Sequence, residues 1–249
     1  MKASVFALVF LFLTTLSSLA AVQAGSTATQ EVVQIGSART QWKYVHSTPR
    51  ASVLVIELGG GRAGFGYGNQ TILADIMSDA GVGGLYVGGK IDELILETFT
   101  SQFSILVGYP VSADINRWLY AAVQWSWAKG YDAVYGYGFS AGALLWVRYA
   151  LGDVFGKPLA HDMSVTGIIA KAYPSALCPW CYGRASSFSP AILLIAGQTD
   201  TAALLSNAQA FYSRIPNKTG NKLLTYQCNH EELAHISTLP IQQWLLTQL

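Results

Sequence analysis

The stretch DAVYGYGFSAGALLWVRYALG, residues 132–152, constrains the fold more than any other part of the chain. Its first half is apolar and rich in aromatic residues, which is typical of a buried strand, and the part from Ala141 onward has the pattern of an apolar helix. The two meet at Ser140, which lies between Gly138 and Gly142 in a G-x-S-x-G pattern. A strand that passes directly into a helix predicts an α/β fold with a tight turn at this serine.

Strands and helices alternate in the same way through most of the chain. The predicted strands cover residues 31–35, 42–46, 51–58, 83–89, 132–138, 164–173, 191–197 and 222–228. The predicted helices cover residues 69–81, 112–131, 141–152, 201–215 and 237–249, and residues 90–110 are assigned to helix and loop. This alternation predicts a mostly parallel central sheet with helices on both faces.

The first 24 residues have the pattern of a secretory signal peptide. Lys2 gives a positive start, an apolar run covers residues 5–13, and a small-residue cleavage site ends at Ala24. The run is short for a bilayer span, and no later segment resembles a membrane helix. We therefore expect a secreted protein whose mature chain, residues 25–249, is a single α/β domain without a transmembrane segment.

The composition gives no sign of a nucleic-acid partner or of a cofactor. The 15 basic and 14 acidic residues balance, and neither sign forms a run. A nucleic-acid partner would leave a basic patch or stripe in the sequence. The P-loop, HExxH and EF-hand patterns are also absent from the sequence, so we expect neither a metal nor a nucleotide.

Three cysteines lie in the mature chain, at Cys178, Cys181 and Cys228. Export favours one disulfide with one thiol left over, and Cys178 and Cys181 are the candidates for it. CPWC resembles a thioredoxin-type redox motif, but that chemistry needs its first cysteine at a helix N-terminus. Residues 182–190 have the composition of a loop, which favours a structural bridge over a free pair, a weak metal site or redox catalysis. The sequence leaves open whether Cys228 joins the bridge.

Polar residues that follow the predicted strands supply the candidates for catalysis, because the carboxyl ends of parallel strands meet at one edge of the sheet. Ser140 follows one strand, and Asp200 follows the strand over residues 191–197. A serine needs a histidine base to become a nucleophile, and the histidine needs an acid to fix its tautomer. We therefore look for the base after the last strand.

Two histidines, His230 and His235, lie in the predicted loop between the last strand and the terminal helix. We prefer His235 because it directly precedes the helix and leaves the loop long enough to turn back over the sheet. His230 is the alternative base, although its neighbours Glu231 and Glu232 are typical of a solvated loop.

With these residues in place, the chain resembles the α/β-hydrolase superfamily, and in particular its small, lid-poor secreted esterases and its dienelactone-hydrolase-like branch. The resemblance rests on GFSAG around Ser140, LLIAGQTD ending at Asp200, and AHIS around His235. It implies an α/β-hydrolase fold with little or no lid, in which Ser140 is the nucleophile, His235 the general base and Asp200 its orienting acid. Dienelactone hydrolase itself uses cysteine as nucleophile, so its particular reaction is not implied.

The tetrahedral intermediate of such a reaction needs hydrogen-bond donors aimed at its oxyanion. One expected donor is the backbone N–H of Ala141, directly after the nucleophile. The loop LGGGRAG resembles the glycine-rich oxyanion loops of esterases, so Gly60 and Gly61 are the other candidates; a flexible glycine turn is the alternative. Four aromatic residues could line an acyl pocket, or belong to the core or the rim of the site: Phe65, Tyr67, Phe139 and Trp180.

Two N-x-T sequons, at Asn69 and Asn217, are candidate glycosylation sites. Asn217 is the better candidate because it lies in a predicted loop between a helix and a strand.

These observations together predict a secreted serine hydrolase that cleaves small or polymer-linked carboxylic esters. A peptidase or amidase on the same scaffold is the first alternative, because a triad alone does not select the scissile bond. The second is a non-catalytic binding protein with the same fold, because a fold by itself does not fix function.

Overall fold

The described residues form an eight-stranded sheet with the strand order β1-β2-β4-β3-β5-β6-β7-β8. A computed structural model of the chain describes residues 27–36, 41–59, 85, 89–96, 109–152, 164–216 and 219–248. The strands are β1 (Thr27–Gln34), β2 (Gln41–Thr48), β3 (Val53–Leu58), β4 (Ile91–Leu96), β5 (Ala133–Phe139), β6 (Gly167–Lys171), β7 (Ala191–Gly197) and β8 (Lys222–Tyr226). β2 pairs antiparallel with both β1 and β4, and the remaining pairs are parallel, which confirms the predicted mostly parallel sheet.

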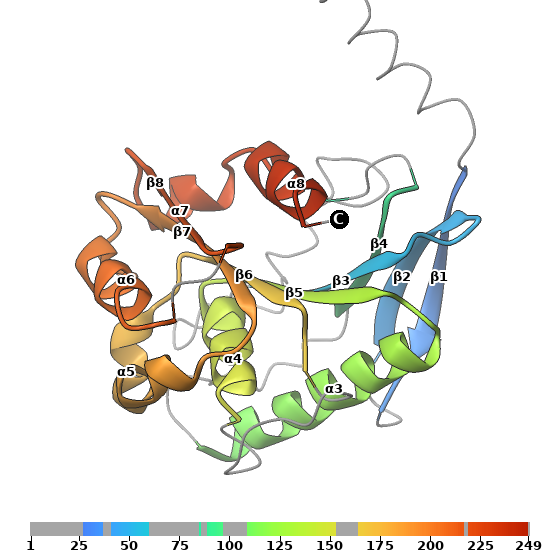
Figure 1. Ribbon diagram of the computed structural model, residues 1–249, viewed down its shortest axis with the longest axis horizontal. Coiled ribbons are helices and arrows are strands. Elements are labelled where there is room, and N and C mark those ends of the chain that lie inside the picture. Colours follow the sequence, from blue (N-terminus) through green and yellow to red (C-terminus); the bar gives the residue numbers. More distant parts are fainter. Residues whose placement is uncertain are drawn as a thin grey trace, which may run out of the picture.

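Helices lie on both faces of this sheet, as predicted. They are α3 (Tyr109–Ala128), α4 (Ala141–Ala150), α5 (Pro179–Arg184), α6 (Leu205–Tyr212), α7 (His230–Ala234) and α8 (Leu239–Leu246), with short 3-10 turns η2 (Ser175–Leu177) and η3 (Ala185–Ser187). Figure 1 shows α3, α4, α5 and α6 on one side of the sheet and α7 and α8 on the other. None of the helices in the described ranges is long and apolar enough to cross a bilayer.

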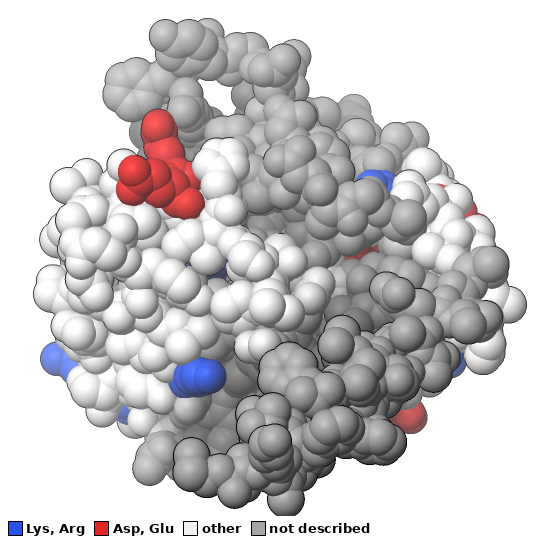
Figure 2. All heavy atoms as spheres, turned by 90° about the horizontal axis from the view of Figure 1, so that it is seen from above, with Lys and Arg blue, Asp and Glu red and all other residues white. Residues whose placement is uncertain are grey.

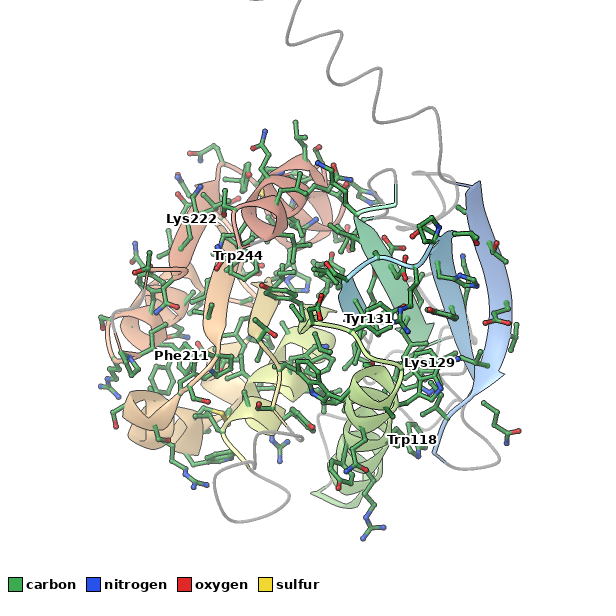
Figure 3. The ribbon with its side chains drawn as sticks, turned by 45° about the vertical axis from the view of Figure 1, so that its right-hand side comes forward. Trp118, Lys129, Tyr131, Phe211, Lys222 and Trp244 are labelled. Atoms are coloured by element: carbon green, nitrogen blue, oxygen red, sulfur yellow. A yellow bond between two sulfur atoms is a disulfide. The ribbon has the colours of Figure 1, made fainter. Side chains whose placement is uncertain are left out.

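Alternate side chains of the strands enter two apolar cores, one on each face. In β3, Leu54 and Ile56 pack into the core on the α3 and α4 side, whereas Val55 packs into the core under α8. Figure 3 labels one residue of each core: Phe211 of α6 belongs to the core on the α3 and α4 side, and Trp244 of α8 belongs to the other. A strand buried on both faces has a nearly continuous apolar sequence, which is why β3, β6 and β7 could be recognised from the sequence.

Strand β4 corrects the expectation of helix and loop over residues 90–110. Its sequence IDELIL contains two acidic residues, which are depleted in strands, so the sequence did not indicate a strand here. The buried Asp92 carboxylate is compensated by hydrogen bonds from the Ser47 backbone N–H at 3.0 Å and the Tyr131 hydroxyl at 2.7 Å. An acid satisfied in this way can occupy an inner strand.

The segment after Cys178 is also different from the prediction. It forms the short helix α5 rather than a loop, and Pro179 occupies its first turn, where the missing N–H of proline costs no hydrogen bond. Three other expected elements, the signal peptide at residues 1–24, the helix at 69–81 and most of the strand at 83–89, lie outside the described residues.

Charged side chains do not gather into a basic patch on the described part of the face in Figure 2, which is seen from the α8 side. The blue Lys and Arg side chains there are scattered singly.

Candidate active site

Ser140 lies at the turn between β5 and α4, with a backbone conformation that non-glycine residues rarely adopt. Its φ is 53° and its ψ is −114°, a strained combination that costs of order 1–3 kcal/mol. Its backbone N–H donates to the carbonyl oxygen of Lys171 at the end of β6, at 2.8 Å, and its own carbonyl accepts from Leu144 in α4 at 3.1 Å. The strained turn is therefore fixed from both the sheet and the helix.

The two glycines of the G-x-S-x-G pattern are required because the backbone passes very close to them. A Cβ atom at Gly138 would lie 2.3 Å from the carbonyl carbon of Gly142, and one at Gly142 would lie 2.5 Å from the carbonyl oxygen of Leu58. Backbone atoms cannot move away as a flexible side chain can. The pattern therefore does mark a tight strand-to-helix turn, as the sequence predicted.

His230 lies between Ser140 and Asp200 and contacts both. Its Nε2 atom is 3.0 Å from the Ser140 Oγ, and its Nδ1 atom is 2.7 Å from Oδ2 of Asp200. A carboxylate only accepts hydrogen bonds, so Nδ1 donates its proton to Asp200 and the lone pair of Nε2 faces the serine hydroxyl. This is the tautomer that a general base for Ser140 needs.

The Asp200 carboxylate is held in place from its other side. It is 2% exposed, and its Oδ1 accepts from the backbone N–H groups of Ala202 at 2.8 Å and Ala203 at 2.7 Å. These bonds leave Oδ2 directed at His230. The ring of Phe139 packs against the imidazole with a centroid separation of 5.1 Å, so the predicted pocket residue Phe139 contacts the base.

The choice of His235 as the base was wrong, and the alternative, His230, is the histidine at the site. His235 is exposed at the C-terminal end of α7, where its backbone N–H bonds to the carbonyl of Glu232. The error came from reading the segment as a loop, although Asn229 and Glu232 form a capping box that starts a helix. His230 is the first residue of that helix and His235 comes five residues, about 1.4 turns, later, so the two histidines lie on different sides of it.

The expected oxyanion donors can be placed only in part. Ala141 begins α4 directly after Ser140, so its N–H is one of the free donors at a helix N-terminus. Gly60 and Gly61 lie outside the described residues, as do the pocket candidates Phe65 and Tyr67. The chain that leads to the two glycines, Leu58 and Gly59, runs against the start of α4 at Gly142.

The chain matches no protein-family model and no curated protein, but it is similar to solved structures over most of its length. The esterase Pf2001 of Pyrococcus furiosus superposes with a TM-score of 0.58 at 16% identity, over 88% of each chain. An alpha-beta serine hydrolase homologue from Coxiella burnetii has a TM-score of 0.57 at 15% identity, over 89% of this chain and 97% of its own. XC6422 from Xanthomonas campestris, described as an a/b serine hydrolase without lid, has a TM-score of 0.54 at 16% identity, over 90% of this chain and 93% of its own.

This protein has an α/β-hydrolase fold. The order of its strands, the turn at Ser140 and the positions of Asp200 after β7 and His230 after β8 agree with that identification. The comparisons do not single out the dienelactone-hydrolase-like branch, so that part of the resemblance stays a prediction.

In this α/β-hydrolase fold, every residue of the link between β6 and β7 is described, and the link contains only η2, α5 and η3. The link contains the disulfide between Cys178 and Cys181, which pairs the two predicted cysteines, while Cys228 keeps a free, buried thiol. Trp180, a predicted pocket residue, packs against the apolar core here, with the Arg184 guanidinium over its ring. No lid domain is inserted in this link.

The described part of the α/β-hydrolase fold assembles no group of three side chains that could hold a metal ion. The sequons at Asn69 and Asn217 both lie outside the described residues, so glycosylation there stays a prediction.

Proposed function

We propose that the protein is a secreted serine hydrolase that cleaves carboxylic esters through an acyl-enzyme on Ser140. The observation that carries the proposal is the hydrogen-bonded line from the Ser140 hydroxyl through His230 to the buried Asp200. A strained serine at the start of a helix, an imidazole in the right tautomer and a fixed carboxylate are the groups that acyl transfer needs.

The reaction begins when Ser140 Oγ attacks the ester carbonyl and its proton passes to His230 Nε2. The imidazolium that forms is stabilised by Asp200 through Nδ1. The oxyanion of the tetrahedral intermediate accepts from the Ala141 N–H and, as the sequence predicts, from the loop of Gly60 and Gly61.

Collapse of the intermediate breaks the bond to the alkoxy oxygen, and His230 gives its proton to the leaving alcohol. Water then attacks the acyl-enzyme in the same way and releases the acid and free Ser140. The short link between β6 and β7 favours an open site, which suits small or polymer-linked esters. The predicted signal peptide supports export.

The proposal is tested with a fluorophosphonate probe and p-nitrophenyl acetate and butyrate. We expect the wild-type protein to be labelled and to release p-nitrophenol, and Ser140→Ala to abolish both without changing the melting temperature by more than a few degrees. A parallel assay with p-nitroanilides of the same acyl groups distinguishes ester from amide hydrolysis. A folded wild-type protein that neither reacts with the probe nor releases p-nitrophenol would refute the proposal.

A further inference from the structure

The position of His230 depends on α7, a helix of five residues. So short a helix is marginal by itself, so tertiary contacts must set its orientation. Leu233 in its middle packs into the core under α8, and hydrogen bonds hold each of its two ends. At its start, the side chain of Asn229 accepts from the Glu232 N–H at 2.9 Å, and the Glu232 carboxylate accepts from the Asn229 N–H at 2.9 Å. This capping box fixes the end of α7 that carries His230.

The other end of α7 is held by Lys171, the last residue of β6. Its Nζ donates to the carbonyl oxygens of Ala234 and Ile236, each at 3.1 Å. The last carbonyls of a helix lack partners within the helix and carry its negative dipole end. An ammonium is therefore the type of group that binds them most strongly.

The same residue also contacts the nucleophile turn. The backbone carbonyl of Lys171 accepts from the Ser140 N–H at 2.8 Å. Lys171 thus contacts the turn that holds Ser140 through its main chain and the helix that holds His230 through its side chain.

Burying the charged side chain of Lys171 costs free energy that an apolar residue would not cost. Lys171 is 1% exposed, and the loss of hydration lowers the pKa of its ammonium to about 8. The nearby Cys228 thiol, if ionised, would favour the charged form. Methionine would fill a similar volume without a buried charge, so packing alone does not require an amine here.

We propose that Lys171 is a positioning residue whose side chain anchors the end of α7 and so keeps His230 Nε2 within hydrogen-bond distance of Ser140. This inference rests on the proposed function of the Ser140 and His230 pair.

The need for an anchor follows from how the two neighbours of His230 are held. The turn fixes Ser140, and two backbone N–H groups fix Asp200, so neither residue can follow a histidine that moves. A displacement of about 1 Å in reacting groups can cost roughly 100-fold in rate. The helix that carries the histidine must therefore be fixed as well.

The test compares Lys171→Met, which keeps the volume and removes the donor, with Lys171→Gln, which keeps a neutral donor. Ile168→Val is the matched control, because Ile168 is buried on the same strand and packs into the core on the opposite face. We expect Lys171→Met to lower kcat for p-nitrophenyl butyrate roughly 10- to 100-fold with KM within about twofold. Lys171→Gln should lie between Lys171→Met and the wild type, and Ile168→Val should keep the wild-type kcat.

A second readout does not depend on turnover. The proton shared by His230 Nδ1 and Asp200 gives a far-downfield NMR resonance when the imidazole is held against the carboxylate. We expect this resonance to shift or broaden in Lys171→Met and to stay unchanged in Ile168→Val.

An unchanged kcat together with an unchanged resonance in Lys171→Met would overturn the inference. If the wild-type protein hydrolyses no ester, the proposed function fails, and the resonance alone then decides the role of Lys171. Failure of both Lys171 variants to fold would show that the residue serves the fold itself and would equally overturn a positioning role.

Discussion

At the residue scale, the strained backbone positions among the described non-glycine residues lie at the ends of two neighbouring strands. The two non-glycine residues with positive φ in these ranges are Ser140, at 53°, and Ala172, at 54°. They stand at the carboxyl ends of the neighbouring strands β5 and β6, and Lys171 contacts one of them and precedes the other. Strain that the surrounding structure enforces in this way is typical of functional sites.

The close backbone approach at Gly142 predicts a large effect of a single methyl group. Gly142→Ala would place Cβ against the carbonyl oxygen of Leu58, so we expect the free energy of unfolding to fall by about 3 kcal/mol or more. The control is Gly183→Ala, since nothing lies within 4 Å of a Cβ at that position in α5. That change should be neutral or stabilise the protein by up to ~1 kcal/mol. Urea denaturation measures both, and similar values would contradict the argument.

The two histidines should differ sharply in their effect on activity. We expect His230→Ala to lower kcat/KM for p-nitrophenyl butyrate by at least ~10³-fold, because it removes the base. His235→Ala should stay within about twofold of the wild type, because His235 is exposed at the end of α7. Steady-state kinetics of the two variants decides the point. A large loss in His235→Ala would mean that the hydrogen-bonded line does not describe the working site.

At the scale of elements, the caps of the short helices matter more than their intrinsic propensities. The N-cap Asn229 accepts a hydrogen bond from the first turn of α7, whereas the N-cap Thr238 of α8 makes no such side-chain bond. The two positions therefore form a matched pair for testing the contribution of a cap.

We expect Asn229→Ala to lower the free energy of unfolding by about 1 kcal/mol, and also to lower kcat, because the cap holds the end of α7 that carries His230. Thr238→Ala should change the stability by less than ~0.5 kcal/mol and leave kcat unchanged. Thermal unfolding and ester hydrolysis are measured on the same preparations. Equal losses in the two variants would show that the cap does not position the histidine.

The elements that could be predicted from the sequence are those whose side chains all obey one pattern. β3, β6 and β7 are apolar runs broken only by Glu57 near the end of β3 and Lys171 at the end of β6. The turn at Ser140 can be recognised from the glycines that its close backbone contacts require. β4 was missed because the donors that compensate its Asp92 carboxylate, Ser47 and Tyr131, lie far from it in the sequence. Long-range compensation of this kind leaves no local pattern.

The sequence predicted only part of the candidate site, because only part of it is marked by local sequence patterns. Ser140 and Asp200 follow strands that can be recognised, and strand ends in a parallel sheet meet at one edge. The base was misassigned between two histidines because a helix of one turn decides which of them faces the serine. Lys171 was not singled out, because its role depends on carbonyl groups of Ala234 and Ile236, which any sequence has.

At the scale of the whole molecule, the buried ammonium of Lys171 makes stability depend on pH. Burial lowers its pKa from 10.5 to about 8, so between these values the unfolded chain binds more protons than the native protein. The free energy of unfolding therefore rises with pH across this window. One pKa unit corresponds to about 1.4 kcal/mol, so the full rise is about 3 kcal/mol.

The prediction concerns the difference between the wild-type protein and Lys171→Met, since the titrating groups that do not interact with Lys171 contribute equally to both. We expect the free energy of unfolding of the wild type to gain about 3 kcal/mol relative to the variant between pH 7.5 and pH 10.5. Urea denaturation at a series of pH values measures it. A difference that stays constant or falls as the pH rises would contradict the buried, charged state of Lys171.

The base of this site follows a strand at the margin of the sheet. β8 is the last strand in the order, and its residues are half-buried or exposed, whereas β3 is buried throughout. Peripheral strands open and exchange their amide hydrogens before a protein unfolds globally. Separation of β8 and α7 from β7 would carry His230 away from Ser140 and remove Leu233 from the core under α8, while β3, β5 and β6 kept their pairing. Local opening of β8 and α7 therefore limits how long the catalytic residues stay in contact. We expect heating to abolish the hydrolytic activity at a temperature below the melting temperature of the protein.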